Sequence, residues 1–371
     1  MTRGSLTFHN QKPQMNPTKI SSFINPIEFI SRAVAVRTEK GMKGLLDALP
    51  IADDQTYTYD PKTPDSGWTA GKFHWVPLGM DRGNAGRIKL ATRPENPIAE
   101  RTINAMESLI ELERSREVAK DENAQMPLSP RDAVLRYYSL PALDQLPRLS
   151  KPIQGMKPRE YARQIAKRIR VRVTYEKPAG EFAVVIEDDG IGQAPSRIHE
   201  TLLSLGASDK GDKPYLIGLF GQGGSSTYAA SKYSWCVSRR APDLLHGEGD
   251  GMGWTVVKEI FRKGRRDPYY AYLAAAPSGA VPILPAAAAD HIQLKHGSRF
   301  AHLNYNFAGG GSAVMRSLYY MLNHILYNPV LPFDLYAGAT IATIYGNGYR
   351  LTNAALEKKA VLDKLFAAQP L

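Results

Sequence analysis

Two neighbouring segments with the pattern of β-strands limit most strongly what this chain can fold into. Residues 169–176, IRVRVTYE, alternate apolar and polar side chains, and residues 182–187, FAVVIE, form an almost continuous apolar run. Alternation is typical of a half-buried strand, and a short continuous apolar run is typical of a central strand. A helix-like segment precedes the pair, and a glycine-rich loop, a helix and several further strands follow it. This order predicts an α+β fold, a two-layer sandwich with helices on one face of a mixed sheet.

The same order argues against two common nucleotide-binding folds. Strands and helices do not alternate strictly, as they would in a Rossmann fold. The sequence also contains no G-x-x-x-x-G-K-[ST] motif, so a P-loop NTPase is not supported.

The composition predicts a globular, cytoplasmic protein without a membrane span. No apolar run approaches the roughly 18 residues that a spanning helix needs. The single cysteine, Cys236, lies in the apolar run YSWCV, where we expect it to be buried and reduced. The formal net charge of +11 favours an anionic partner such as nucleic acid or nucleotide phosphates. A basic surface that only faces water is the alternative.

The first motif that could carry chemistry follows the strand FAVVIE. Asp188 comes directly after this run, and Gly190 and Gly192 complete the pattern D-x-G-x-G. A carboxylate at a strand end can accept a hydrogen bond from an exocyclic amino group such as that of adenine, and glycines let a flat ring approach the backbone. Taken alone, the motif favours a tight turn.

A second motif is the glycine-rich segment GLFGQGG, which leads into a helix-like stretch. Its backbone N–H groups can face an anion, and the following helix start adds partial positive charge. Lys210, in the loop upstream, supplies a charge for a terminal phosphate. The alternative is a flexible surface loop. The predicted phosphate-contacting residues of the segment are Gly218, Gly221, Gln222, Gly223 and Gly224.

A third motif lies on a strong helix pattern that starts at Asn96-Pro97, with Asn96 as the expected cap. Glu100, Asn104 and Glu107 are spaced by four and three residues and therefore share one helical face. The Asn104 oxygen can bind Mg²⁺, and Glu100 can orient and deprotonate a water that attacks a γ-phosphate. The alternative is the polar face of an amphipathic helix.

A weaker fourth motif, Gly297-Ser298, opens a late strand. The hydroxyl of Ser298 can bond an adenine ring or an ordered water. A plain turn-to-strand junction gives the same pattern.

Together, and in this order, the four motifs resemble those of the GHKL ATPases, which share the Bergerat ATP-binding fold. The stretch LLSLGASDKGDKPYLIGLFGQGGSSTYAAS is most similar to the MORC and heat-shock-chaperone branches, and the resemblance covers roughly residues 75–310. The matching positions are Glu100/Asn104, Asp188/Gly190/Gly192, Gly218/Gly221/Gly223 and Gly297/Ser298.

The resemblance implies a role for each end of an ATP site. At the adenine end, Asp188 would bind the exocyclic amino group, Gly192 would leave room for the ring, and Ser298 would support recognition.

At the phosphate end, the resemblance implies that Asn104 holds Mg²⁺ and that Glu100 activates the attacking water. Lys210 and the Gly218–Gly224 backbone would form a lid over the phosphates. The implied activity is ATP hydrolysis, with ATP and Mg²⁺ bound.

The sequence departs from the family pattern in three places, one of which is an insertion between the first helix and the strand IRVRV that is longer than in most members. Glu107 and Ser108 stand where the family usually has Asp-Ala, which leaves the role of Glu107 open, and Ser298 replaces the commoner threonine. A competing alignment would put the catalytic helix at REYARQIAK, with Glu160 but with Gln164 where asparagine is expected. We prefer the first alignment for that reason.

The resulting division is an N-terminal extension (1–74), an ATP-binding domain (75–328) with a proline-rich insertion at about 122–158, and a partial transducer-like segment (329–371). Because the family couples ATP binding to dimerisation, the implied function is a clamp cycle of a homodimer on nucleic acid or a protein client. One alternative is a nucleic-acid-binding or scaffold protein that uses ATP as a structural ligand. Another is a protein-histidine kinase, although no upstream dimerising helix with a phosphoacceptor histidine is evident.

Overall fold

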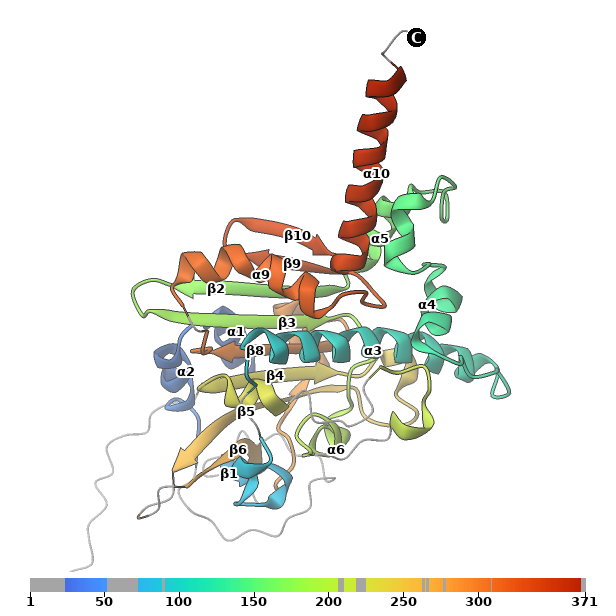
Figure 1. Cartoon of the computed structure of the whole chain (residues 1–371). Coiled ribbons are helices and arrows are strands. Elements are labelled where there is room, and N and C mark those ends of the chain that lie inside the picture. Colours follow the sequence, from blue (N-terminus) through green and yellow to red (C-terminus); the bar gives the residue numbers. More distant parts are fainter. Residues whose placement is uncertain are drawn as a thin grey trace, which may run out of the picture.

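One mixed β-sheet forms the centre of the molecule (Figure 1). The computed structural model describes residues 24–51, 73–88, 91–205, 210–217, 225–261, 264, 267–275, 278–307 and 309–367. The strands lie in the order β1-β6-β5-β4-β8-β3-β2-β9-β10, and β7 pairs with β5. Paired strands are antiparallel except β2 and β9, which are parallel. The strands are β1 (Phe73–Pro77), β2 (Ile169–Glu176), β3 (Glu181–Asp188), β4 (Tyr233–Arg239), β5 (Gly251–Phe261), β6 (Pro268–Ala275), β7 (Ile283–Pro285), β8 (Gly297–Leu303), β9 (Phe333–Ala337) and β10 (Thr340–Ile344).

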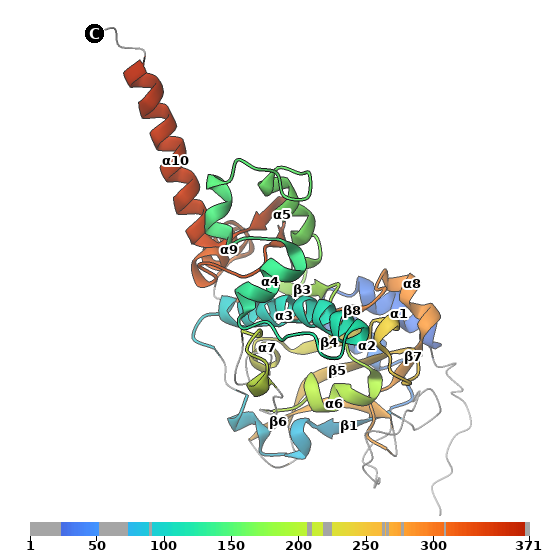
Figure 2. The ribbon, with the colours of Figure 1, turned by 90° about the vertical axis from the view of Figure 1, so that its right-hand side faces the viewer.

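Helices lie on both faces of this sheet, as the side view in Figure 2 makes clear. The longest is α3, whose first residue is Glu95, so Asn96 lies inside the first turn and does not cap the helix as predicted. The helices are α1 (Pro26–Ala35), α2 (Glu39–Leu46), α3 (Glu95–Lys120), α4 (Pro130–Tyr138), α5 (Pro158–Ala166), α6 (Ile198–Thr201), α7 (Ser226–Ala229), α8 (Ala289–Ile292), α9 (Gly311–Ile325) and α10 (Gly346–Ala367).

The two strands that the sequence singled out pair with each other. β2 and β3 form an antiparallel pair in which Ile169 lies opposite Asp188. Buried and partly exposed residues alternate along most of β2, whereas β3 is buried at every position after the first. Because β3 lies between β2 and β8, the central position predicted from its apolar run is confirmed.

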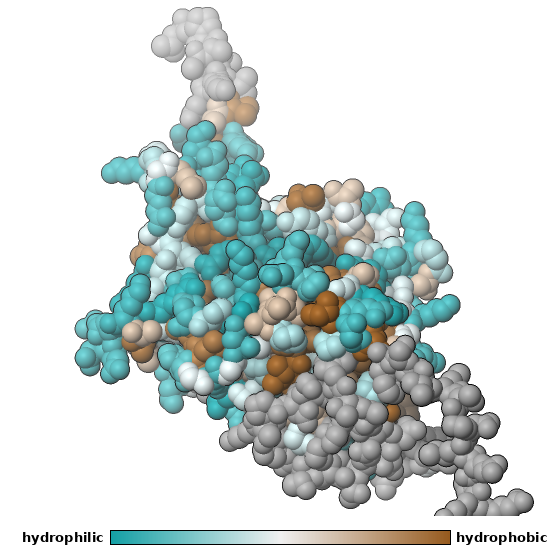
Figure 3. Space-filling model, turned by 180° about the vertical axis from the view of Figure 1, so that it is seen from behind, coloured by the Kyte–Doolittle hydropathy of each residue, from teal (hydrophilic) through white to brown (hydrophobic). Residues whose placement is uncertain are grey.

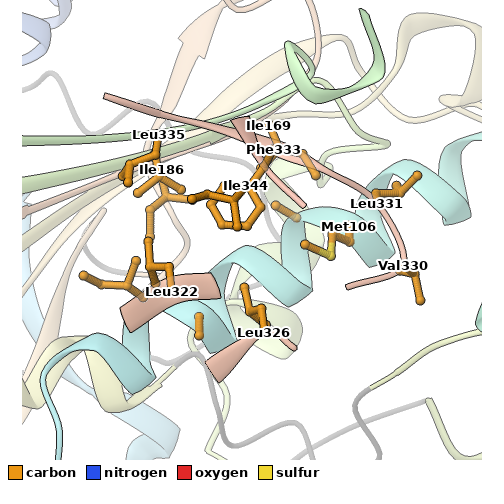
Figure 4. Close-up of a cluster of buried hydrophobic side chains, with 14 of the residues drawn as sticks. Met106, Ile169, Ile186, Leu322, Leu326, Val330, Leu331, Phe333, Leu335 and Ile344 are labelled. Carbon is orange, nitrogen blue, oxygen red and sulfur yellow. The ribbon is translucent and has the colours of Figure 1, made fainter. Parts of the chain in front are cut away.

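The first helical layer includes α3, α5 and α9 and packs on one face of the sheet through a large apolar core. Figure 4 shows Met106 of α3 and Leu322 of α9 beside Ile169 and Ile186 of the sheet. Removal of these side chains from water is the main stabilising contribution to this layer.

A second helical layer covers the opposite face, so the prediction of helices on one face only is wrong. α1, α2 and α8 pack there against strand residues that include Trp235 and Trp254. The ring centroids of Phe29 and Trp254 lie 4.4 Å apart. The physical reason is visible in β3, whose apolar residues point to both faces and therefore need a cover on each.

The chain after residue 329 extends the same sheet. β9 and β10 form a hairpin, and β9 pairs with β2. α10 then leaves the body of the molecule (Figures 1 and 2), with its beginning packed against α9 and the 3-10 turn Leu143–Arg148. The strands of the predicted transducer-like segment thus belong to the central sheet.

The surface seen from behind (Figure 3) is largely hydrophilic over the described residues, with hydrophobic residues at scattered positions. Among the helices described, none combines the length and the low polarity needed to cross a membrane. Cys236 is buried in β4, as predicted.

Candidate functional site

A cavity lies between α3 and the sheet. Its volume is about 440 Å³, and its lining includes Asn104 of α3, Asp188 of β3 and Ser298 of β8. The three residues are far apart in the sequence, but β3 and β8 are neighbouring strands and α3 packs across β3. The structure therefore brings together the residues predicted from the helix, the acidic strand end and the late strand.

One face of α3 forms a wall of this cavity. Arg101, Asn104, Ser108 and Glu111 all line it, and their spacing of three, four and three residues puts them on one side of the helix. Met106, on another side, packs into the apolar core. α3 thus presents a polar stripe to the cavity and an apolar one to the core.

Asp188 is almost completely buried, with 5% of its surface exposed. Its Oδ1 accepts a hydrogen bond of 3.0 Å from the backbone N–H of Gly190, and the Ser108 hydroxyl also donates to the carboxyl. Burial raises the pKa of Asp188 to about 7; these two hydrogen bonds act in the opposite direction, and the charge of Asp189 adds to the rise. The cavity wall therefore contains a carboxyl group that changes protonation near neutral pH.

Gly190 and Gly192 allow the loop after Asp188 to fit against its neighbours. A Cβ atom on Gly190 would lie 2.2 Å from the Ser108 Oγ, and one on Gly192 would lie 1.8 Å from the Arg239 carbonyl oxygen. Gly192 also has a φ of +63°, which side chains disfavour. In the structure Gly192 leaves room for the backbone at the end of β4, while the room for a ring that the resemblance implies at this position stays a prediction.

Ser298 lies opposite Asp188 in the β3–β8 pair. Its hydroxyl is 2.9 Å from that of Ser238, which also donates to the carbonyl of Gly297 at 3.1 Å. Either hydroxyl can be the donor of this pair. A hydroxyl oxygen has two lone pairs, so Ser298 keeps at least one with which it can accept a hydrogen bond from a ligand.

The predicted phosphate lid lies largely outside the described residues. The backbone of Lys210 belongs to a short 3-10 turn, Lys210–Asp212, but its side chain is outside them as well. The lid positions outside the described residues are Gly218, Gly221, Gln222, Gly223 and Gly224.

Both flanks of that segment reach the cavity. On the upstream side, the Ile217 N–H donates to Glu107 Oε1 at 2.7 Å, and Lys213 forms an ion pair of 2.7 Å with Glu111. On the downstream side, Ser225 lines the cavity. Glu107, whose role the sequence left open, thus links α3 to the residue just before the glycine-rich segment.

Glu100 is not among the residues that line the cavity. Its side chain is exposed, one turn before Asn104 on the same side of α3, so its role as a base stays a prediction. Glu160 and Gln164 of the competing alignment are also exposed, and neither lines the cavity. Of the two candidate helices, α3 is the one that faces the cavity.

Arg101 and Phe300 also line the cavity, and the sequence did not point to them. Arg101 precedes Asn104 by three residues on a helix, and Phe300 follows Ser298 by two residues on a strand. The helical and strand periods alone could have placed each of them on the same face as its predicted neighbour.

The site can be tested for its fit to Mg²⁺. The described residues contain no group of three or more His, Cys, Asp or Glu side chains placed to hold a metal ion. Mg²⁺, however, usually keeps several waters and is held by one or two protein oxygens together with substrate phosphates. Asn104, which lines the cavity, fits that kind of site, in which most metal ligands are phosphate oxygens and water.

Comparisons with known proteins leave the site to be interpreted from its own geometry. No protein-family model matches the chain, and no curated protein gives a significant match.

Proposed function

We propose that this chain binds ATP with Mg²⁺ in the cavity beside α3 and hydrolyses it, as an ATPase of the GHKL type with a Bergerat-like fold. The observation that carries the proposal is that Asn104, Asp188 and Ser298, from three separate motifs, line one cavity. Motif matches that arose by chance would have no reason to meet in space. The volume of about 440 Å³ lies within the range of roughly 300–1,000 Å³ that is typical of ligand pockets.

The chemistry of the cavity wall supports an adenine at the Asp188 end. The ionised carboxyl accepts a hydrogen bond from the exocyclic amino group, and the hydroxyl of Ser298 accepts another from the ligand or a bound water. Ile186 and Ile191 also line the cavity and offer apolar surface to a flat ring.

The phosphates would lie toward Asn104 and the glycine-rich segment. In this proposal the Asn104 oxygen binds Mg²⁺, which would neutralise phosphate charge when present. The hydrogen bond from Ile217 to Glu107 fixes where the segment starts relative to α3. Glu100 would orient and deprotonate the attacking water from the same side of the helix.

The proposed ATPase drives a conformational cycle, as a cytoplasmic homodimer that closes on a client. The net charge of +11 supports an anionic client such as nucleic acid, while a protein client is the other candidate. Residues 1–74 and 329–371 would transmit the change around the nucleotide.

The test is calorimetric titration of the full chain with a non-hydrolysable ATP analogue and Mg²⁺. Asp188→Asn replaces an acceptor oxygen by an N–H₂ group and is expected to weaken binding about 10- to 100-fold, the effect of losing a hydrogen bond to a charged group. Asp189→Asn is the matched control, since Asp189 is the next residue but pairs with Arg170 outside the cavity lining. Absence of binding to the wild-type chain, or equal losses in both variants, would contradict the proposal.

A second candidate is a nucleic-acid-binding or scaffold protein that holds ATP without turnover. The exposed position of Glu100, outside the cavity lining, favours it. If this candidate is right, we expect the chain to bind ATP without releasing phosphate. We also expect it to bind DNA with an affinity that falls steeply as the salt concentration increases. Phosphate release at a steady rate from the wild-type chain would exclude it.

A further inference from the structure

A buried arginine forms part of the cavity wall. Arg101 of α3 lines the cavity and is only 4% exposed. Its guanidinium carbon lies 4.1 Å from the centre of the Phe300 ring, and its Nη2 donates to the Thr227 hydroxyl at 3.0 Å. The ring contact and the hydrogen bond fix the orientation of the guanidinium, so the charge has a defined place in the wall.

The positive charge of Arg101 contributes to the pKa shifts of neighbouring groups. Burial lowers the pKa of His302 well below its ordinary value, and the charge of Arg101 lowers it further. Burial raises the pKa of Cys236 to about 12, while Arg101 acts in the opposite direction. The guanidinium of Arg101 is thus a cation in a buried part of the wall, and it acts on its buried neighbours.

The cavity therefore has two chemically different ends. Asp188 is hydrogen-bonded to Ser108, and Arg101 lies seven residues earlier on α3, which is about 10 Å along the helix axis. Asn104 lies between them on the same stripe. An acceptor at one end and a fixed cation at the other match a ligand with an amino-bearing base and an anionic tail.

The hydrogen bond to Thr227 shows which part of the chain lies beside Arg101. Thr227 lies two residues after Ser225, which lines the cavity where the described chain resumes after the glycine-rich segment. Arg101 is thus tied to the downstream flank of the predicted phosphate lid. The glutamates of the wall have their own contacts, since Glu107 accepts from Ile217 and Glu111 pairs with Lys213. The third, Glu200, forms an ion pair of 3.1 Å with Arg197, which also lines the cavity.

We propose that Arg101 binds the phosphate tail directly and makes the site select nucleotides over nucleosides. This inference rests on the proposed function, because it assigns one end of the same cavity. The flat guanidinium can donate two parallel hydrogen bonds to phosphate oxygens while it stays stacked on Phe300.

The experiment measures calorimetric affinities for ADP and adenosine without Mg²⁺, so that a metal ion cannot carry the phosphate contact. The wild-type chain is expected to bind ADP at least about tenfold more tightly than adenosine. Arg101→Met, which keeps much of the side-chain length, is expected to weaken ADP binding about 10- to 100-fold and to leave adenosine binding within about twofold. Arg116→Met removes a charge from the same helix outside the cavity lining and should change neither affinity by more than about twofold.

The possible results separate the two proposals. A wild-type chain that binds neither ligand refutes the nucleotide site itself. Equal wild-type affinities for ADP and adenosine, or equal losses of both in Arg101→Met, refute the role of Arg101 alone. Circular dichroism checks folding; should Arg101→Met not fold, Arg101→Lys keeps the charge but loses the paired hydrogen bonds. It is expected to lower ADP affinity selectively, and an unchanged preference for ADP in that variant would also overturn the inference.

Discussion

The protonation state of Asp188 should control nucleoside affinity across the neutral pH range. Burial raises the pKa of this carboxyl to about 7, so the neutral acid predominates below that pH and the carboxylate above it. The carboxylate accepts a hydrogen bond from an exocyclic amino group, whereas the neutral acid presents an O–H donor. Affinity should therefore rise with pH, which is the opposite of the behaviour expected if burial kept the acid neutral in the complex.

The size of the effect follows from the pKa. With a value of about 7, about one tenth of the sites are ionised at pH 6 and about nine tenths at pH 8. Since apparent affinity scales with the fraction of binding-competent protein, the dissociation constant should fall about ninefold to tenfold over this interval.

The assay is calorimetric titration with adenosine, because its lack of phosphates removes ligand titration near pH 7. Asp188→Asn is the control and should bind weakly with no pH dependence. His296, whose Nδ1 lies 2.6 Å from the Gly190 carbonyl oxygen, is kept in the variant, so any pH dependence that remains in Asp188→Asn comes from a group other than Asp188. A wild-type affinity that stays constant or falls between pH 6 and 8 would refute the reasoning.

Two further predictions concern catalysis and packing. Glu100→Gln should keep ATP affinity within about twofold and lower phosphate release at least about 100-fold, because it removes the proposed base; ordinary turnover in this variant would exclude Glu100 from that role. Gly192→Ala should lower the free energy of unfolding in urea by several kcal/mol, since its Cβ would meet the Arg239 carbonyl oxygen at 1.8 Å. Gly180→Ala is the control: its φ is +70° but no atom lies within 4 Å, so it should cost only about 1–2 kcal/mol, and equal losses would show that the contact with Arg239 is unimportant.

The strands could be predicted because the pattern that identifies each strand lies within its own residues. The alternation of β2 and the apolar run of β3 state how many faces of each strand are buried. The second helical layer was missed because helical spacing states only that one face of a helix is buried, and not what covers that face. That this face of α1 meets Trp254 is a property of the complete fold, which short-range spacing does not contain.

The candidate site divides in the same way. Asp188, Asn104 and Ser298 could be selected because their motifs are short and lie on strong helix and strand patterns. Arg101 escaped notice because a charged residue on a helix is usually exposed, and only the tertiary structure brings Phe300 beneath it. The packing role of Gly192 was not predicted for a related reason: its neighbour Arg239 is remote in sequence.

α10 projects from the body of the molecule, so a small rotation at its base would move its far end by a larger distance. Its 22 residues span about 33 Å, and its first residue is fixed by a hydrogen bond of 2.9 Å from the Gly346 N–H to Asn323 Oδ1. The hairpin before it is joined through β2 to β3, the strand that ends at Asp188. A tilt of about 5° at the first residue of α10 would displace its far tip by about 3 Å, so a strand movement too small to disturb the core would become a shift the size of a hydrogen bond at the end of the helix.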